Sequence, residues 1–137
     1  MDQGKNIQVT VINQDGYHAL AQAREHALLL NVKKGSGEAG FTAAETLIAA
    51  LGTCLMTNIN GIGEKMRLKI DEARIEFTAT RSDDPAVITD LAYQLFLKSS
   101  ESPEILAELF EVSKKWGTVT NTLIGGITPK GELIVEK

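Results

Sequence analysis

The feature that most constrains this sequence is the segment from Thr42 to Ile62, which has the pattern of one long helix. It opens with a capping box between Thr42 and Glu45, in which the threonine caps a helical N–H group and the glutamate reaches back to the cap. A stripe then recurs at steps of three and four residues: Leu47, Leu51, Cys54, Leu55, Asn58 and Ile62. We therefore expect a helix that begins after Thr42 and ends between Gly61 and Met66.

The glycines of this segment indicate that the helix has close neighbours on several sides. Gly52, Gly61 and Gly63 each cost about 1 kcal/mol relative to alanine in a helix interior. We expect the close approach of another backbone to compensate for them. A helix whose side chains are small or apolar on nearly every side favours burial on more than one face. In a chain of 137 residues, this pattern predicts a second subunit as the additional cover.

The flanking segments predict an α+β fold in a single domain, residues 1–137. Three strands are expected first, at Ile7–Val11, Tyr17–Ala23 and Glu25–Val32. A β-hairpin follows at 72–79 and 91–98, with its loop at Arg81–Pro85. Ser102 and Pro103 open a second helix, for which Gly117 is the expected left-handed C-cap. A short helix from Thr118 to Leu123 and a final strand, Gly131–Glu136, complete the prediction.

Composition excludes several classes of function. The net charge of -4 and the absence of a basic cluster longer than two residues argue against nucleic-acid binding. We find no apolar run of the length that spans a membrane and no signal-peptide core, so we expect a cytoplasmic protein. One cysteine and two histidines argue against an internal disulfide and a structural metal site, and no cofactor is expected. A single cysteine in such a protein is most often a small, inert core residue.

The segment from Phe41 to Cys54, Phe-Thr-Ala-Ala-Glu-Thr-Leu-Ile-Ala-Ala-Leu-Gly-Thr-Cys, resembles the signature of the OsmC/Ohr family. In that family, a Pro-x-Glu-x-Leu segment leads through Ala-Ala-x-Gly-x to a reactive cysteine. The order of elements after the helix and the stretch Val119–Leu123 are also similar. The resemblance covers roughly residues 20 to 136 and implies a small bacterial protein that forms an intertwined homodimer. It also implies the reduction of organic hydroperoxides in the response to oxidative stress.

The resemblance assigns roles to three residues. Cys54 matches the cysteine that attacks the peroxide, and Glu45 matches the glutamate of the motif. Arg24 is the only arginine before Cys54, so it is the candidate for the arginine that activates the thiol. The expected chemistry needs a thiolate, which Arg24 would stabilise while Glu45 holds its guanidinium. An apolar surround would favour an organic peroxide over hydrogen peroxide.

Two positions depart from the family pattern. The second, resolving cysteine of the family lies in a Cys-Pro-Val segment, and Gly117 occupies the matching position here. Ala43 replaces the proline of the first motif. Without a second cysteine, an external thiol would have to reduce the oxidised Cys54. The same departure is compatible with a loss of the activity.

Geometry leaves the role of Glu45 open. Glu45 and Cys54 are nine residues apart, which in a continuous helix is about 13.5 Å of rise and a half-turn of rotation. Glu45 therefore acts from a second subunit, from a bent helix start, or only as a helix cap.

Three interpretations of function remain at this stage. The first is a one-cysteine thiol peroxidase acting on organic hydroperoxides. The second is a non-catalytic dimer that binds an apolar small molecule in an interface pocket. The third is a structural dimer in which Cys54 is silent. We expect His26 to be a core or interface residue and His18 to be solvated.

Overall fold

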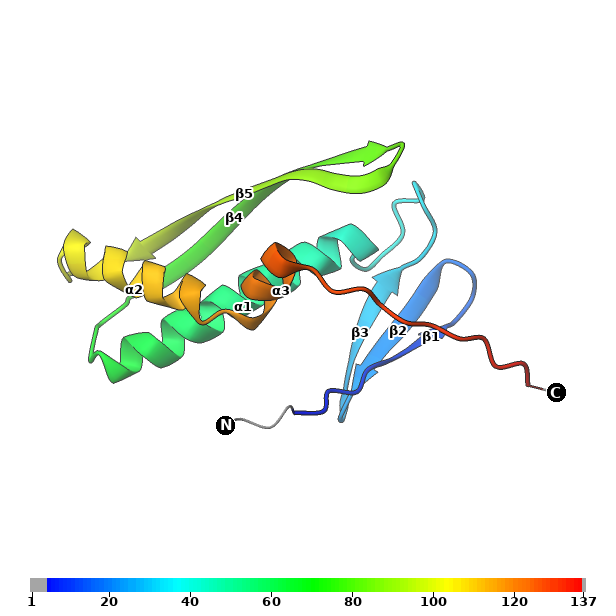
Figure 1. Ribbon diagram of the computed structural model, residues 1–137, viewed down its shortest axis with the longest axis horizontal. Helices are drawn as coiled ribbons and strands as arrows, with labels where there is room; N and C mark the ends of the chain where they lie inside the picture. Colours follow the sequence, from blue (N-terminus) through cyan, green and yellow to red (C-terminus); the bar gives the residue numbers. More distant parts are fainter. Residues whose placement is uncertain (1–4, 137) are drawn as a thin grey trace. The chain divides into compact units, whose positions relative to one another are not determined.

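The computed structural model describes residues 5–136, which form two compact units. The N-terminal unit ends at Ala49 and the C-terminal unit begins at Ala50. The long helix α1, Ala43–Lys65, belongs to both, because it runs without interruption across this boundary (Figure 1). The predicted order of three strands, a long helix, a hairpin and a second helix is confirmed.

The N-terminal unit contains an antiparallel sheet in the order β1-β2-β3. Its strands are β1 (Thr10–Asn13), β2 (His18–Ala23) and β3 (His26–Asn31). A turn joins the first two strands, and the side chains of Asn13 and Asp15 accept backbone N–H hydrogen bonds within it. The first strand begins at Thr10 and not at Ile7. Thr10 pairs with Gln22, so the same register would carry Ile7 and Gln8 past the end of β2 at Ala23.

Both faces of this sheet carry exposed apolar side chains. The register places Val11 and Leu28 on one face and Ile12 and Leu29 on the other. Val11 is 60% exposed and Leu28 is 62% exposed. Ile12 and Leu29 are also exposed, and Ala19 is the one apolar residue that is fully buried in the described part of this unit. The sheet therefore lacks a sizeable core of its own.

The C-terminal unit contains the hairpin formed by β4 (Glu72–Asp83) and β5 (Ala86–Lys98). The hairpin is longer than predicted, because an irregularity at Thr80/Arg81 lets pairing continue past the expected loop to a turn at Asp84-Pro85. The strand predicted at 91–98 is present, and burial alternates along it: Leu91, Tyr93, Leu95 and Leu97 are the less exposed set. In Figure 1 the hairpin runs along α1 and α2.

Two further helices complete the C-terminal unit: α2 (Pro103–Lys115) and α3 (Thr118–Gly125). Ser102 caps α2 as predicted, its Oγ accepting the N–H of Ile105 at 3.2 Å. The core contains Leu51, Leu55 and Ile59 of α1 together with Leu109 of α2. These apolar side chains, all at most 5% exposed, fix α1 in this unit.

Of Gly52, Gly61 and Gly63 in α1, only Gly52 has a tight neighbour, and that neighbour is a side chain and not the backbone that the sequence predicted. A Cβ on Gly52 would lie 3.1 Å from the ring of Phe77 in β4, and one on Gly63 would lie 3.8 Å from Leu109. Gly61 has open space around it. The helix ends at Lys65 in a Schellman motif, in which Leu68 and Arg67 donate to the carbonyls of Gly63 and Glu64.

The predicted final strand, Gly131–Glu136, is wrong for this structure. Residues 126–136 are irregular and form no strand in the part of the chain that is described. Leu133, Ile134 and Val135 are each more than 70% exposed. The apolar run is therefore present in the sequence, but the described part of the chain gives these residues no strand to pair with.

One helix, α1, is long and apolar enough to cross a membrane by its length and composition, which the search for apolar runs in the sequence had not indicated. Core helices of soluble proteins meet the same two criteria. The face of α1 formed by Leu51, Leu55 and Ile59 is packed within the C-terminal unit.

Candidate functional site

Cys54 lies beside the buried stripe of α1 and not within it. The buried residues follow a step of four: Leu51, Leu55, Ile59 and Gly63. Leu47, which the sequence placed on the same stripe as Cys54, is 42% exposed. Cys54 itself is a free thiol of intermediate exposure. Cys54 is therefore held by a packed helix without being fully buried, and whether its thiol is reactive or silent stays open.

The thiol opens into a pocket of about 410 Å³ in the C-terminal unit. One wall comes from α1 and the other from the junction between α2 and α3. The residues that line it are Ala50, Thr53, Cys54, Thr57, Asn58, Trp116, Thr118 and Val119. The Asn58 side chain donates to the backbone carbonyl of Ser113 at 3.0 Å, which ties α1 to α2 below the pocket.

Gly117 is not the left-handed C-cap that the sequence predicted. Trp116 is the C-cap of α2, and Gly117 has an extended backbone with φ -82° and ψ 115°. The physical reason is that a new helix begins one residue later, so Gly117 serves as the N-cap of α3. The glycine matters sterically, because a Cβ here would lie 3.2 Å from the Sγ atom of Cys54 and 2.9 Å from Oγ1 of Thr120.

The N-terminus of α3 faces the pocket through Thr118 and Val119. The first hydrogen bond of the α3 ladder is from the N–H of Asn121 to the carbonyl of Gly117, and no side chain caps this end. The preceding N–H groups carry the partial positive charge of a helix N-terminus, which favours an anion such as a thiolate. The sequence predicted this short helix, but not that its N-terminus lies beside Cys54.

Glu45 forms the predicted capping box. Its Oε1 accepts the N–H of Thr42 at 2.9 Å, and the Thr42 hydroxyl accepts the N–H of Glu45 at 3.3 Å. Oε2 has no hydrogen-bond partner among residues 5–136. The cap therefore uses one carboxylate oxygen and leaves the other available.

Arg24 lies at the exposed tip of the hairpin between β2 and β3, next to the paired residues Ala23 and His26. Its φ of 55° is in the left-handed region, which is uncommon for a residue other than glycine. Its guanidinium has no ion-pair partner in the part of the chain that is described. Its activating role stays a prediction.

His18 is not solvated as the sequence predicted, and His26 is not in the core of this chain, while its role at an interface stays a prediction. The side chain of His18 is only 21% exposed, and its ring nitrogens lie 3.1 Å from Asp15 and 3.3 Å from Glu38, so it contacts two carboxylates and is not simply solvated. The hydrogen bond from His18, with the N–H groups of Tyr17 and His18, lowers the pKa of Asp15 to about 2. His26 is exposed in the sheet. Within residues 5–136, no three metal-ligating side chains gather in a group.

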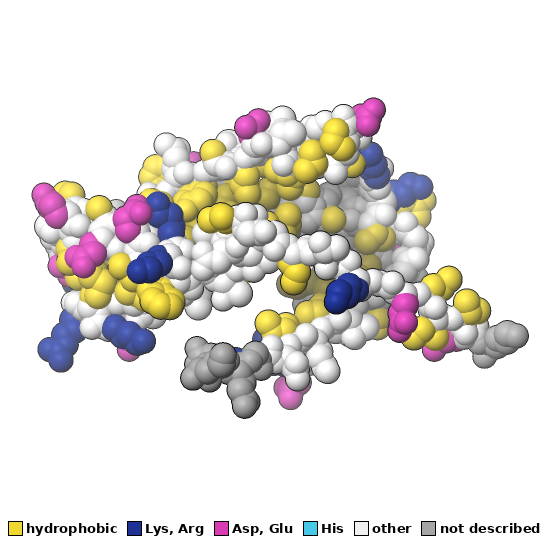
Figure 2. All heavy atoms as spheres, in the orientation of Figure 1, with side chains coloured by type: hydrophobic (Ala, Val, Ile, Leu, Met, Phe, Trp, Pro, Cys, Tyr) yellow, Lys and Arg dark blue, Asp and Glu magenta, His cyan; other side chains and the backbone are white. Residues whose placement is uncertain are grey.

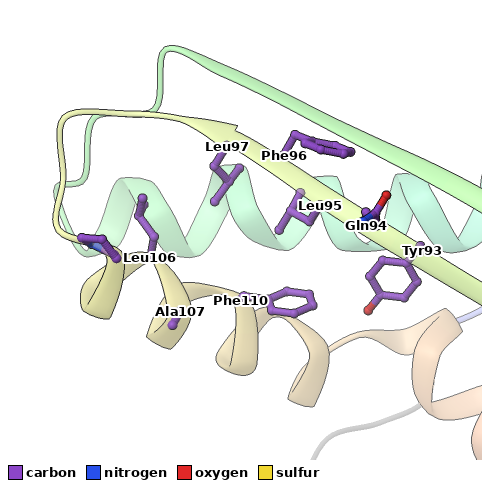
Figure 3. Close-up of a pocket in the computed structure, with 9 residues that line it drawn as sticks. Tyr93, Gln94, Leu95, Phe96, Leu97, Leu106, Ala107 and Phe110 are labelled. Carbon is purple, nitrogen blue, oxygen red and sulfur yellow. The ribbon is translucent and has the colours of Figure 1, made fainter.

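A second hollow of about 580 Å³ lies between β5 and α2. Figure 3 shows Leu95 on the strand and Leu106 and Phe110 on the helix pointing into this space. Tyr93 packs edge-on against Phe110, with ring centres 6.2 Å apart, and burial raises the pKa of its hydroxyl. Hydrophobic side chains gather here in the space-filling view (Figure 2). We call this hollow the apolar groove.

Comparison with known proteins assigns the family. The family model described as OsmC-like protein matches residues 35–131, which is more than half of the chain. None of the curated protein sequences matches this chain.

Solved structures share the fold at low sequence identity. An OsmC-like protein from Mycoplasma pneumoniae is 18% identical, with a TM-score of 0.81 and 90% of each chain covered. The organic hydroperoxide resistance protein of Bacillus subtilis is 12% identical, with a TM-score of 0.61; 88% of this chain and 92% of that one are covered. A protein from Legionella pneumophila, described as an organic hydroperoxide resistance protein, is 12% identical, with a TM-score of 0.64 and coverage of 90% and 93%.

Proposed function

Because the chain belongs to the OsmC-like protein family, we propose that it reduces organic hydroperoxides with Cys54 as the nucleophile and an external thiol as the reductant. The observation that carries this proposal is the position of Cys54, whose thiol is accessible in a pocket at the uncapped N-terminus of α3. Two structures with this fold are named for organic hydroperoxide resistance, which supports the same chemistry.

The proposed reaction begins with the Cys54 thiolate. It attacks one peroxide oxygen, the O–O bond breaks, and the departing alkoxide takes a proton from solvent and leaves as an alcohol. The sulfur is oxidised by two electrons to a sulfenic acid, and the peroxide is reduced by two. The positive end of α3 favours the thiolate at the start of this step, and the apolar parts of Ala50, Trp116 and Val119 suit an organic peroxide.

We propose roles in the reaction for Arg24 and Glu45 as well. Arg24 has an unpaired guanidinium on an exposed hairpin tip, and its left-handed backbone costs about 1 kcal/mol relative to glycine. We propose that this arginine stabilises the thiolate and the departing alkoxide. The free Oε2 of Glu45 would orient the guanidinium while Oε1 caps α1.

An external thiol is needed because the chain has one cysteine. One small thiol condenses with the sulfenic acid to give a mixed disulfide and water. A second thiol attacks that disulfide, which releases the free disulfide and restores the Cys54 thiol. The cytoplasm, where small thiols are kept reduced, is the compartment that suits this cycle.

We further propose a homodimer in which a second copy covers the N-terminal sheet. The support is the exposure of Val11 and Leu28 on one face and of Ile12 and Leu29 on the other. Sedimentation should give a dimer for the native chain at micromolar concentration, and Leu28→Lys should shift it toward monomer. Val87→Lys is the matched control, because Val87 is similarly exposed but lies in the C-terminal unit. A native monomer would contradict the dimer.

The decisive experiment measures the consumption of cumene hydroperoxide with dithiothreitol as the reductant. The native chain should turn over, and Cys54→Ser should show no activity above the rate of the thiol alone. Thr118→Ser is the control, because it keeps a hydroxyl at an exposed position of the same pocket. If native protein and Cys54→Ser consume peroxide equally, the peroxidase proposal fails.

A second variant tests why an external thiol is required. The 3.2 Å from a Cβ at position 117 to the Cys54 Sγ is close to the roughly 3 Å between the corresponding atoms of a disulfide. Gly117→Cys should therefore form an internal disulfide when peroxide is added, with both thiols lost from a thiol count. Gly61→Cys, on α1 and with open space around it, should keep its added thiol free. Free thiols in oxidised Gly117→Cys would contradict the geometry.

The apolar groove favours a second candidate function, the non-catalytic binding of a hydrophobic small molecule. Its lining of leucines and Phe110 suits an acyl chain, and it is separate from the Cys54 pocket. A fluorescent fatty acid should then bind with an affinity that Cys54→Ser leaves unchanged. Ala107→Trp should weaken it, because Ala107 lines the groove. Absence of binding by the native chain would exclude this function.

A further inference from the structure

Near Cys54 lies a buried hydroxyl that has no hydrogen-bond partner among the described residues. Oγ1 of Thr120 is one of two buried side-chain polar atoms without a partner in the described part of the chain, the other being Oγ of Ser113. Buried polar atoms are nearly always hydrogen-bonded, because an unpaired hydroxyl loses the hydrogen bonds that water would provide. An orphan hydroxyl beside a reactive thiol therefore needs a physical reason.

Gly117 brings the hydroxyl and the thiol to one small space. A Cβ at position 117 would lie 2.9 Å from Oγ1 of Thr120 and 3.2 Å from Sγ of Cys54, so both atoms border the volume that glycine leaves open. Oγ1 nevertheless makes no hydrogen bond to the reduced sulfur. An oxygen atom bound to Sγ would extend the acceptor into this space.

We propose that Thr120 donates a hydrogen bond to the oxygen of oxidised Cys54 and so prolongs the life of the sulfenic acid. This inference rests on the proposed peroxidase function. The hydroxyl is unpaired in the reduced protein and becomes paired only after oxygen transfer, so the hydrogen bond stabilises the oxidised form selectively. A longer-lived sulfenic acid suits a chain that must wait for a thiol from solution. The N-terminus of α3, which carries Thr120 in its first turn, also favours negative charge on the oxygen of oxidised Cys54.

The experiment follows the oxidised species without a thiol present. One equivalent of cumene hydroperoxide is added, and intact mass spectrometry measures the mass gain of one oxygen atom on Cys54 and its decay. Thr120→Val replaces the hydroxyl by a methyl group of similar size. We expect its half-life for the sulfenic acid to fall about tenfold, the value of one charge-assisted hydrogen bond, while Thr120→Ser retains the native half-life.

Thermal unfolding gives a readout that a merely structural role would not reproduce. In the reduced state, Thr120→Val should melt at or above the temperature of the native chain, because it removes an unpaired buried hydroxyl. In the freshly oxidised state this order should reverse. Ser113→Ala is the matched control: it removes the other orphan hydroxyl and should leave the half-life of the sulfenic acid unchanged.

The outcomes separate this inference from the proposed function. If native protein never gains an oxygen on Cys54, the peroxidase function itself fails. If the oxygen is gained and Thr120→Val decays at the native rate, the function stands and the role of Thr120 is overturned. A shortened half-life in Ser113→Ala as well would also overturn it, because the effect would then not be specific to Thr120.

Discussion

The two units of this chain differ in how completely they bury their apolar side chains. The C-terminal unit buries Leu51, Leu55, Ile59 and Leu109 almost completely, and these contacts fix the helix that carries Cys54. The N-terminal unit has both faces of its sheet exposed and places Arg24 at a hairpin tip. Cys54 is thus positioned by a core within its own unit. Arg24, the proposed activating residue, lies instead in a unit whose sheet we propose is covered by a second copy of the chain.

The largest expected effect tests the core of the C-terminal unit. Leu109→Ala should lower the free energy of unfolding by about 3 kcal/mol, through lost burial and a residual cavity. Urea unfolding followed by the fluorescence of Trp116 measures this. Leu28→Ala is the matched substitution in the N-terminal unit, and should cost less than about 1 kcal/mol in dilute protein because Leu28 is 62% exposed. Equal costs at every protein concentration would remove the contrast between the units.

The next prediction separates activity from stability at Arg24. Arg24→Gly should reduce kcat/KM for cumene hydroperoxide about 100-fold, which corresponds to about 2.7 kcal/mol, because a charge that stabilises thiolate and alkoxide is lost. The same change should leave the fold as stable or more so, since glycine tolerates the left-handed backbone. Peroxidase assays and thermal melting measure the two effects.

Arg67→Gly is the control for this prediction. Arg67 has nearly the same backbone conformation, with φ 58°, but lies in the Schellman motif that ends α1. It should gain stability by the same mechanism and retain full activity. Equal losses of activity in both variants would show that net charge, and not the position of Arg24, is responsible.

These two regions also show what sequence reasoning could establish. The capping box at Thr42 and Glu45, the end of α1 and the Ser102 cap were predictable, because each rests on a local pattern of a few residues. The resemblance found Cys54 and the family from a similar local motif. The position of Gly117 beside Cys54 was not predictable, because it depends on how residues 63 positions apart in the sequence pack in three dimensions.

The sequence predictions that were wrong also depended on contacts with other parts of the chain. The sequence pattern of Gly131–Glu136 is that of a strand, but a strand forms only where another strand offers hydrogen bonds. Gly117 follows a helix, as a C-cap glycine does, yet the helix that begins at Thr118 decides its backbone conformation. His18 was expected in solvent because it follows a turn, whereas Glu38 approaches it from a later loop.

A smaller effect distinguishes two glycines of α1. Gly61→Ala should raise the free energy of unfolding by about 0.5–1 kcal/mol, since its Cβ meets open space and alanine favours the helix. Gly52→Ala should lower it by about 1 kcal/mol, because its Cβ would lie 3.1 Å from the ring of Phe77 in the packed unit. Chemical unfolding measures both. A stabilising Gly52→Ala would show that the ring of Phe77 moves freely and that this part of the core is loosely packed.

The smallest effect is acid sensitivity, which we expect to be confined to the N-terminal unit. The hydrogen bond from His18 lowers the pKa of Asp15 to about 2, below its ordinary value of 3.8. A carboxylate with a lowered pKa contributes stability above its unfolded pKa, and this contribution disappears as the pH falls from about 4 toward 2. Asp15→Asn should therefore melt slightly below the native chain at pH 6, and the two should converge near pH 2. NMR titration of the Asp15 carboxyl provides the direct measurement. A carboxyl that titrates near 3.8 would show that the hydrogen bond between Asp15 and His18 does not form in solution. The turn at Asp15 would then need the second copy of the chain to become ordered, as we propose for the exposed sheet.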